Sequence, residues 1–308
     1  MPLSASIVCV TYERPEGLRR LLASAAGQRA IDIVVVNNSS TPIDLVGAAT
    51  PTRVVELAAG LNVSRARNVG WRSSEGDVVV FVDDDNVMNP GMVRALLDVL
   101  EDDRIGLAAP IMLGMSAEPE LLCAGVKRSM WTTRTQGVMP VGCTWPIESM
   151  PSSYAIKRTA LDEVGGFDEA DFPFHYEETD LARRIAQAGW GVVGVAGAQV
   201  LHETARRSPV AELSRAASLS SMQRVSLQIR ARFLFHRRYA TGRLQYWIGG
   251  LAAPICYSAL LTFAVVVSRE ITLERKKLLV RAIASGASVG VLRGPRYISH
   301  QRVQRGSV

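Results

Sequence analysis

Residues 78–86 read VVVFVDDDN, and this stretch decides the fold. Its five leading apolar residues, four of them valine, are typical of a strand buried on both faces of a parallel sheet. Three carboxylates, Asp83, Asp84 and Asp85, follow directly at the end of that strand. Because uncompensated charges at the rim of a core are costly, a positive partner is expected beside them. A hard divalent cation that holds a phosphate is one candidate, and a solvated acidic turn is the alternative.

Apolar runs and helical repeats alternate on both sides of this stretch. The alternation predicts an α/β fold with a doubly wound, mostly parallel sheet. Residues 112–150 show no firm period and are expected to form a binding loop. The predicted strands are 6–10, 31–36, 54–57, 78–82, 105–111 and a final pair over 192–200, and the predicted helices are 15–26, one starting near Asn62 or Ser64, 92–100 and 177–188.

Polar residues follow several of these strands. In doubly wound sheets, ligands bind beyond the carboxyl ends of the strands, near a switch in strand order. Thr11-Tyr12, Asn37-Asn38 and Asp83 to Asp85 stand at such ends. These three groups are therefore expected to converge on one site.

Charge divides the chain into two unequal parts. Residues 1–205 carry 17 Lys and Arg against 26 Asp and Glu, a net charge of −9, whereas residues 206–308 carry 18 against 3, a net charge of +15. Such asymmetry indicates two parts with different partners. The four cysteines lack CxxC spacing, so neither a disulfide framework nor a cysteine zinc site is indicated. The first residues lack a basic segment and a cleavage site, so no secretory signal is expected.

The C-terminal part is predicted to meet a membrane. Residues 206–243 read as a basic helical segment, in which arginines alternate with aromatic and aliphatic side chains. From 246 to 268 there are 23 residues without a charge, enough to span a bilayer. Both flanks are basic, which conflicts with a simple span and allows a re-entrant or interfacial hairpin. Span, hairpin and buried soluble helix stay open, and residues 244–308 are interpreted as a membrane-associated helical region with a basic tail.

Seven motifs occur in the order that one enzyme family shows. The chain resembles the family 2 inverting glycosyltransferases, which have the GT-A fold and use nucleotide-sugar donors. This resemblance covers roughly residues 5–204 and implies a GT-A glycosyltransferase domain over 1–205. The motifs are IVCVTYERPEGLRRLLAS at 7–24, IVVVNNSS at 33–40, LNVSRARNVG at 61–70, VVVFVDDDN at 78–86, GGFDE at 165–169, HYEETDLARRIAQAGW at 175–190 and VLHE at 200–203.

The resemblance implies a divalent metal, Mg²⁺ or Mn²⁺, at the end of the central strand. Asp83 and Asp85 would hold it at the diphosphate of the donor, where it neutralises the leaving group. Asp84 would face the ribose or stand behind the ligands, and which two of the three aspartates bind the ion stays open. His202 matches a family residue near the metal or the diphosphate. An ordinary surface or core histidine is its alternative.

The resemblance also implies a catalytic base at the start of a helix. In the family the base is usually the second member of an acidic pair, which is Glu178 here, with Glu177 and Asp180 nearby. A base on the face opposite the leaving group takes the proton of the acceptor hydroxyl. Acidic residues are also favoured in a first helical turn by the backbone dipole alone, which is the structural alternative.

The donor-binding residues are expected around the first two strand ends. Arg67 and Asn68 resemble residues beside the donor phosphates, and arginine suits phosphate bidentately. Thr11 and Tyr12 would flank the base, although Tyr12 also suits a core position. Asn37 departs from the family, which usually carries Asp there to accept a hydrogen bond from a pyrimidine. Asn offers a donor and an acceptor, so a UDP- or dTDP-sugar is still expected.

The tail resembles relatives that work at the inner membrane face on lipid-linked or wall acceptors. We therefore expect a hexose or deoxyhexose to be transferred to a lipid-linked or cell-envelope glycan at the cytoplasmic face of the membrane. A nucleotidyltransferase remains an alternative, but the loop after the first strand has no glycine until Gly17. A non-catalytic membrane or nucleic-acid binder is another. The uncharged run beside the arginines favours anionic lipid over RNA, so no nucleic-acid partner is expected.

Overall fold

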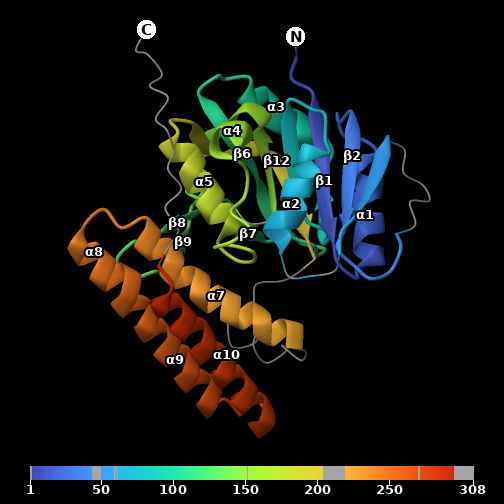
Figure 1. Ribbon diagram of the computed structural model, residues 1–308. Helices are drawn as coiled ribbons and strands as arrows, with labels where there is room; N and C mark the ends of the chain where they lie inside the picture. Colours follow the sequence, from blue (N-terminus) through green and yellow to red (C-terminus); the bar gives the residue numbers. More distant parts are fainter. Residues whose placement is uncertain are drawn as a thin grey trace.

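The structure, a computed structural model, describes residues 2–43, 50–58, 60, 62–150, 152–203, 219–269 and 271–294. An α/β body is followed by a bundle of helices, which Figure 1 shows in orange and red. A ten-stranded sheet forms the centre of the body, which confirms the predicted α/β class. The basic stretches predicted at 206–218 and 295–308 lie outside the described residues.

The sheet is mixed, with a parallel half built first along the chain. Strands β1, β2, β3 and β4 pair in parallel, whereas β11 runs antiparallel between β4 and β6. The main order is β10-β12-β6-β11-β4-β1-β2-β3, with β5 and β7 attached to β12 and β6. The strands are β1 (Ala5–Thr11), β2 (Asp32–Asn37), β3 (Thr52–Glu56), β4 (Val78–Val82), β5 (Asn86–Met88), β6 (Ile105–Gly114), β7 (Leu121–Cys123), β8 (Val126–Arg128), β9 (Thr135–Gly137), β10 (Thr144–Pro146), β11 (Ser153–Lys157) and β12 (Gly191–His202).

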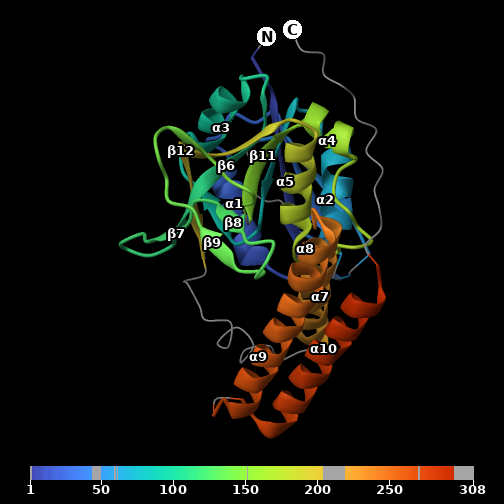
Figure 2. The same cartoon turned by 90° about the vertical axis from the view of Figure 1, so that its left-hand side faces the viewer.

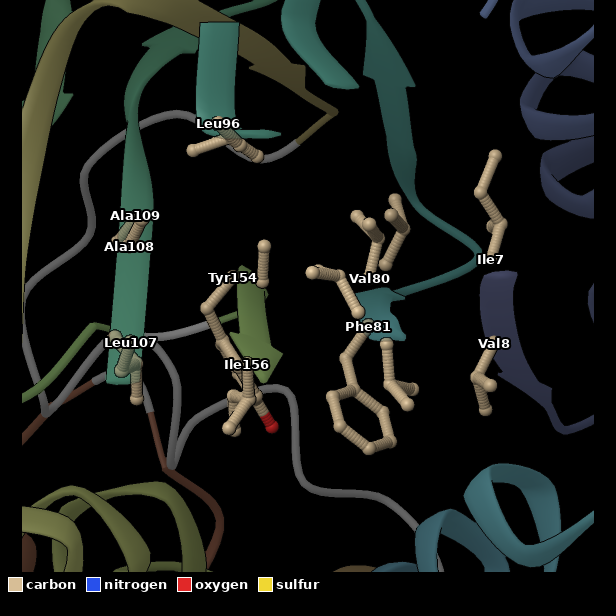
Figure 3. Packing of buried hydrophobic residues seen from close by; sticks show 14 of the residues in the cluster. Ile7, Val8, Val80, Phe81, Leu96, Leu107, Ala108, Ala109, Tyr154 and Ile156 are labelled. Atoms are coloured by element: carbon tan, nitrogen blue, oxygen red, sulfur yellow. The ribbon is translucent and has the colours of Figure 1, made fainter. Parts of the chain in front are cut away.

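The apolar runs of the sequence form the interior of this sheet. Every residue of β4 is buried, as the valine run predicts. Figure 3 shows side chains of Ile7, Val80, Phe81, Tyr154 and Ala108 side by side across β1, β4, β11 and β6. Burial of apolar surface is the main contribution that favours folding, at about 25 cal/mol per Å². It fixes the strand ends that carry the polar residues.

Two regions differ from the expectation. The predicted final strand pair is one strand, β12, whose pairing with β6 shifts register between Val195 and Gln199. That irregularity explains why the run resembles two strands. Residues 112–150 contain the end of β6 and the short strands β7 to β10, so they are not simply a loop.

Helices cover both faces of the sheet. In Figure 2, α2, α4 and α5 stand on one side of it and α3 on the other. Helix α2 begins after Asn62, whose side chain accepts a hydrogen bond from the backbone N–H of Arg65. This cap is one of the two that the sequence suggested. The helices of the body are α1 (Pro15–Ala25), α2 (Val63–Arg72), α3 (Met92–Leu100), α4 (Arg158–Val164) and α5 (Glu177–Gln187).

The C-terminal helices have a small core of their own. Helices α9 and α10 form an antiparallel pair that packs on α7, with Ile229, Phe233, Val265 and Leu279 buried between them. Residues 243–267 form a helical stretch that is long and apolar enough to cross a membrane; an 18-residue window in it has a mean hydropathy of 2.0, and 28% of that window is buried. The elements are α7 (Leu219–Arg238), α8 (Arg243–Trp247), the π-helix η1 (Ile248–Ala252), α9 (Ala253–Val267) and α10 (Leu273–Leu292).

Candidate active site

Asp84 ties the ends of β1 and β4 together. Its carboxylate accepts a hydrogen bond from the Thr11 hydroxyl at 2.8 Å and one from the Tyr12 backbone N–H at 3.3 Å. A side chain at position 17 would collide with the Asp84 carbonyl oxygen, which explains the glycine there. Burial raises the pKa of Asp84 to about 6, against the effect of the Thr11 bond. Thr11 and Asp84 thus form the floor at this strand end, and Tyr12 lies half-buried beside them.

Asp85 and His202 face each other at the rim of the sheet. Antiparallel pairing of β5 with β12 sets His202 opposite Asn86, and the Glu203 N–H donates to the Asp85 carbonyl. The His202 Nε2 lies 3.7 Å from the Asp85 Oδ1, which is buried and has no hydrogen-bond partner in the described part of the chain. The other Asp85 oxygen accepts a bond of 2.7 Å from Arg14.

Arg67 holds three carboxylates together. Its guanidinium lies 2.9 Å from Asp83, 3.1 Å from Glu177 and 3.0 Å from Glu178, and the arginine is 3% exposed. Glu177 is buried and Asp83 and Glu178 are partly buried, so one cation among these three acids leaves excess negative charge. Burial accordingly raises the pKa values of Asp83 and Glu177, and it raises that of Glu178 to about 8. This Arg67 cluster joins the end of β4 to the start of α5.

A strained turn aims the two glutamates. His175 and Tyr176 have φ values of 65° and 66°, in the left-handed region that non-glycine residues seldom adopt. The Ser152 backbone N–H donates to Glu178 Oε1 at 3.3 Å, the same oxygen that Arg67 contacts, and so helps to fix that carboxylate. Strain of this kind gathers at functional sites, where the surrounding structure enforces it.

Asn37 and Asn68, which were predicted to bind the donor, form hydrogen bonds to other residues of the protein. Asn37 is fully buried, donates to the Thr41 carbonyl and to Glu56, and accepts from the Ser39 N–H. Asn68 donates to the Phe167 carbonyl and to Glu169, and it accepts from Phe167 N–H and Trp71 Nε1. Asn68 therefore fixes the turn after α4, where Gly165 is the left-handed cap of the helix.

Asp180 lies in a second network rather than in the Arg67 cluster. Its buried carboxylate accepts bonds from Arg184 at 2.8 Å, Arg238 at 2.9 Å and the Tyr239 hydroxyl at 2.7 Å. Arg238 also lies 2.8 Å from Asp168 and 2.6 Å from Asp171. Part of the charge asymmetry is thus neutralised inside the molecule, which sequence reasoning did not anticipate.

Replacing Arg238 with Met should destabilise the protein strongly. The change leaves Asp168, Asp171 and Asp180 without a shared buried cation. Removing one partner of a buried ion pair typically costs about 3–5 kcal/mol of unfolding free energy. Denaturant unfolding followed by circular dichroism measures the loss. Arg94→Met is the matched control because Arg94 and its partner Asp98 are both exposed, and an unchanged midpoint for Arg238→Met would contradict the expectation.

The metal-binding capacity of the site is modest. Within the described ranges, no group of three or more His, Cys, Asp or Glu side chains is placed so that it could hold a metal ion. The Asp85 oxygen without a partner and the His202 nitrogen across from it are an oxygen and a nitrogen donor, which suit Mn²⁺ or Mg²⁺ as two ligands of a larger set. A ligand that brings further oxygens would complete it.

Comparison with known proteins points in one direction. The family described as glycosyl transferase family 2 matches residues 6–119, and glycosyl transferase family group 2 matches residues 78–286. An N-acetylglucosaminyl-diphospho-decaprenol L-rhamnosyltransferase of Mycobacterium tuberculosis is 28% identical over 245 residues, which cover 68% of this chain and 80% of that relative.

Two solved structures share the fold. One is GalNAc-T7 with UDP, GalNAc and Mn²⁺, with a TM-score of 0.58 and 14% identity over 86% of this chain and 58% of that one. The other is a mannosyltransferase from Pyrobaculum calidifontis with GDP-Man and Mn²⁺, with a TM-score of 0.55 and 14% identity over 94% of this chain and 88% of that one.

Proposed function

The chain belongs to glycosyl transferase family group 2, and we propose that it transfers a sugar from a nucleoside diphosphate to a hydroxyl acceptor with inversion. The observation that carries the proposal is the Arg67 cluster, which joins the aspartates at the end of β4 to the glutamate pair of α5. A diphosphate bound at the aspartates and an acceptor hydroxyl bound at the glutamates would then both lie next to the anomeric carbon of the donor sugar.

Glu178 is the proposed base. As the bond from the anomeric carbon to the diphosphate breaks, the acceptor oxygen bonds to that carbon and its proton passes to Glu178. The raised pKa near 8 makes this carboxylate a stronger base than an ordinary glutamate. Glu177 is proposed to stay on Arg67 and balance its charge, while Asp180 is proposed to position α5.

Asp85 and His202 are the proposed protein ligands of Mg²⁺ or Mn²⁺. Such an ion, when bound with the donor, neutralises charge on the departing diphosphate. Asp83 is proposed to face the donor together with Arg67, and Thr11, Tyr12 and the turn around Asn37 to face its nucleoside. The two solved structures named above hold Mn²⁺ with a nucleotide or a nucleotide sugar, which supports the proposal that a metal ion accompanies the donor.

The acceptor is proposed to be a lipid-linked glycan of the cell envelope at the cytoplasmic face of the membrane. Support comes from the name of the mycobacterial relative, whose acceptor is carried on diphospho-decaprenol. Further support comes from α9, where Leu260 and Phe263 are 68% and 65% exposed. The α9–α10 pair also brings Lys276 to the far end of α9, where its Nζ donates to the Val266 carbonyl. An apolar hairpin with a cationic tip suits an interfacial helix better than a single span.

Membrane binding should depend on the exposed face of α9. We expect Leu260→Asp with Phe263→Asp to weaken binding to phosphatidylglycerol-containing vesicles by roughly tenfold or more, since a charge at membrane depth costs about 2.5–3.5 kcal/mol. Vesicle flotation measures the partition. Ile31→Asp serves as the control, because Ile31 is an exposed apolar residue of the body. Equal flotation of the α9 variant and the wild type would refute the membrane role of this helix.

The donor can be identified by thermal unfolding with a panel of nucleotide sugars, each with Mn²⁺ or with EDTA. We expect one UDP- or dTDP-sugar to raise the unfolding temperature in Mn²⁺ and to lose that effect in EDTA. Release of pyrophosphate from a nucleoside triphosphate plus a sugar phosphate would instead favour a nucleotidyltransferase.

A further inference from the structure

The β8–β9 hairpin encloses a pocket that the proposed reaction does not use. Its volume is about 470 Å³, and every residue that lines it has a polar or charged side chain. Three of the lining residues are cations, none is acidic, and the others are hydroxyl residues and one amide. The cations are Lys127, Arg128 and Arg134. A polar pocket with this charge suits an anion rather than a neutral sugar.

Arg128 is the most buried of the three cations that line the pocket. Its guanidinium stacks on Tyr176, 4.2 Å from the ring centre, and donates to the Tyr176 hydroxyl at 2.9 Å. Its buried Nε has no hydrogen-bond partner among the described residues. Burial and the neighbouring Arg232 together lower the pKa of Arg128, which marks an uncompensated positive region.

Carboxylates do not neutralise this region. Within the part of the chain that the structure describes, no Asp or Glu forms an ion pair with Lys127, Arg128, Arg134 or Arg232; the ion pairs found there join other residues. The nearest acid, Glu148, accepts from the backbone N–H of Arg128. Arg128 is partly buried and Arg232 is buried, and a buried cation without a counter-charge is costly, so an anionic ligand is expected to supply that charge.

The hairpin that forms the pocket contacts the residues on either side of the glutamate pair. Tyr176, which Arg128 covers, directly precedes Glu177 and Glu178 in the chain. Val126 of β8 pairs with Ser149, whose hydroxyl is 3.1 Å from that of Thr179. The hairpin therefore rests against the first turn of α5.

The other side of the same hairpin meets the C-terminal helices. Arg232 of α7 donates to Thr133, and Gly249 of η1 lies so close to the Met130 carbonyl that a side chain there would collide with it. Figure 1 places β8 and β9 between α5 and the α7–α8 corner, and Figure 2 shows them beside α5 and α8. Trp131 and Trp247 are 46% and 62% exposed, and exposed tryptophans are typical of the headgroup layer of a membrane.

We propose that this pocket binds the diphosphate of a lipid-borne acceptor and so presents the acceptor sugar to Glu178. The inference rests on the proposed transferase function and names the substrate class of its acceptor side. Lys127 and Arg134 contact the outer oxygens, and Arg128 contacts the inner phosphate. The lipid chain then leaves toward η1 and α9.

The test measures binding of farnesyl diphosphate, inorganic pyrophosphate and farnesol to the full chain in detergent. EDTA is present throughout, so that metal-held pyrophosphate at Asp85 does not contribute. Farnesyl diphosphate should bind most tightly and farnesol least. Lys127→Ala with Arg134→Ala should weaken farnesyl diphosphate about a hundredfold, at about tenfold for each charged hydrogen-bonding group removed. Arg19→Ala with Arg94→Ala, which removes two exposed cations of the body, should leave binding unchanged.

Three results would overturn the inference. Wild-type affinity in the Lys127/Arg134 variant would show that the pocket is not the site. An equal loss of affinity in the Arg19/Arg94 control would show that the weaker binding comes from the lower net charge of the protein and not from the pocket. Equal binding of pyrophosphate and farnesyl diphosphate would exclude a lipid-borne ligand. Binding of UDP and of dTDP with Mn²⁺ is measured on the same proteins without EDTA, and the nucleotide that the wild type binds should bind normally to both variants. If the wild type bound neither nucleotide, the result would count against the proposed transferase and leave the diphosphate result standing.

Discussion

Glu178→Gln should abolish sugar transfer while leaving nucleotide binding intact. The amide keeps the shape of the side chain and an oxygen that accepts from the Ser152 N–H, but it does not take up a proton. Loss of a positioned base typically lowers turnover by about 10²–10⁴-fold. Transfer is measured with the donor found by the thermal panel, and nucleotide affinity is measured by calorimetry with Mn²⁺.

The pH dependence of the wild type gives this prediction a second readout. Because the pKa of Glu178 is raised to about 8, the carboxylate that accepts the proton is the minor form at pH 7. Transfer should therefore rise with pH, pass half its maximum near pH 8 and level off above that, whereas the residual rate of Glu178→Gln should be flat over the same range. Glu16→Gln changes an exposed glutamate of α1 and serves as the control. Full turnover by the Glu178 variant would place the base elsewhere.

Asp85→Asn should remove metal-dependent nucleotide binding. Asn keeps the size of the side chain but loses the negative charge of the oxygen that faces His202. Changes to the groups that merely orient metal ligands already cost about 10–100-fold in metal affinity, so loss of a ligand charge should cost at least as much. The affinity for UDP in Mn²⁺ should fall to the value that the wild type shows in EDTA.

The control for this change is Asp98→Asn, which alters an exposed aspartate of α3. If Asp85→Asn binds UDP as tightly as the wild type and keeps its response to Mn²⁺, the metal is held by other residues. If Mn²⁺ raises the UDP affinity of a His202→Ala variant as much as that of the wild type, His202 is not a metal ligand, and the assignment of Asp85 is unaffected.

Much of the fold could be predicted because its central strands are short apolar runs. The run at 78–82 leaves few alternatives to a buried strand, and the GT-A fold expected from the motifs is shown by the likeness to solved glycosyltransferases. The antiparallel strand β11 was not predicted. Its five residues, SYAIK, include a polar residue at each end, and only the tertiary pairing with β4 and β6 stabilises them as a strand.

Only those site residues could be predicted that lie at strand ends which the sheet topology brings together. Thr11 with Asp84, and Asp85 with His202, follow from that rule. Asp180 could have been separated from Glu178, because two residues along a helix lie about 200° apart around its axis. The structural role of Asn68 could not be predicted, because the spacing of residues along the chain does not show which groups an amide side chain will hydrogen-bond. The buried pairing of Arg238 with the body was equally hidden within an acid-free stretch.

The most direct test of the account is transfer itself. Membranes from cells that make the protein are incubated with radiolabelled UDP- and dTDP-sugars and Mn²⁺, and the lipid extract is counted. Label from one donor is expected to enter the lipid fraction, to be released by mild acid as for a diphosphate link, and to fall to background with Glu178→Gln. Label that enters no lipid from any donor, or that enters equally with Glu178→Gln, would contradict this expectation.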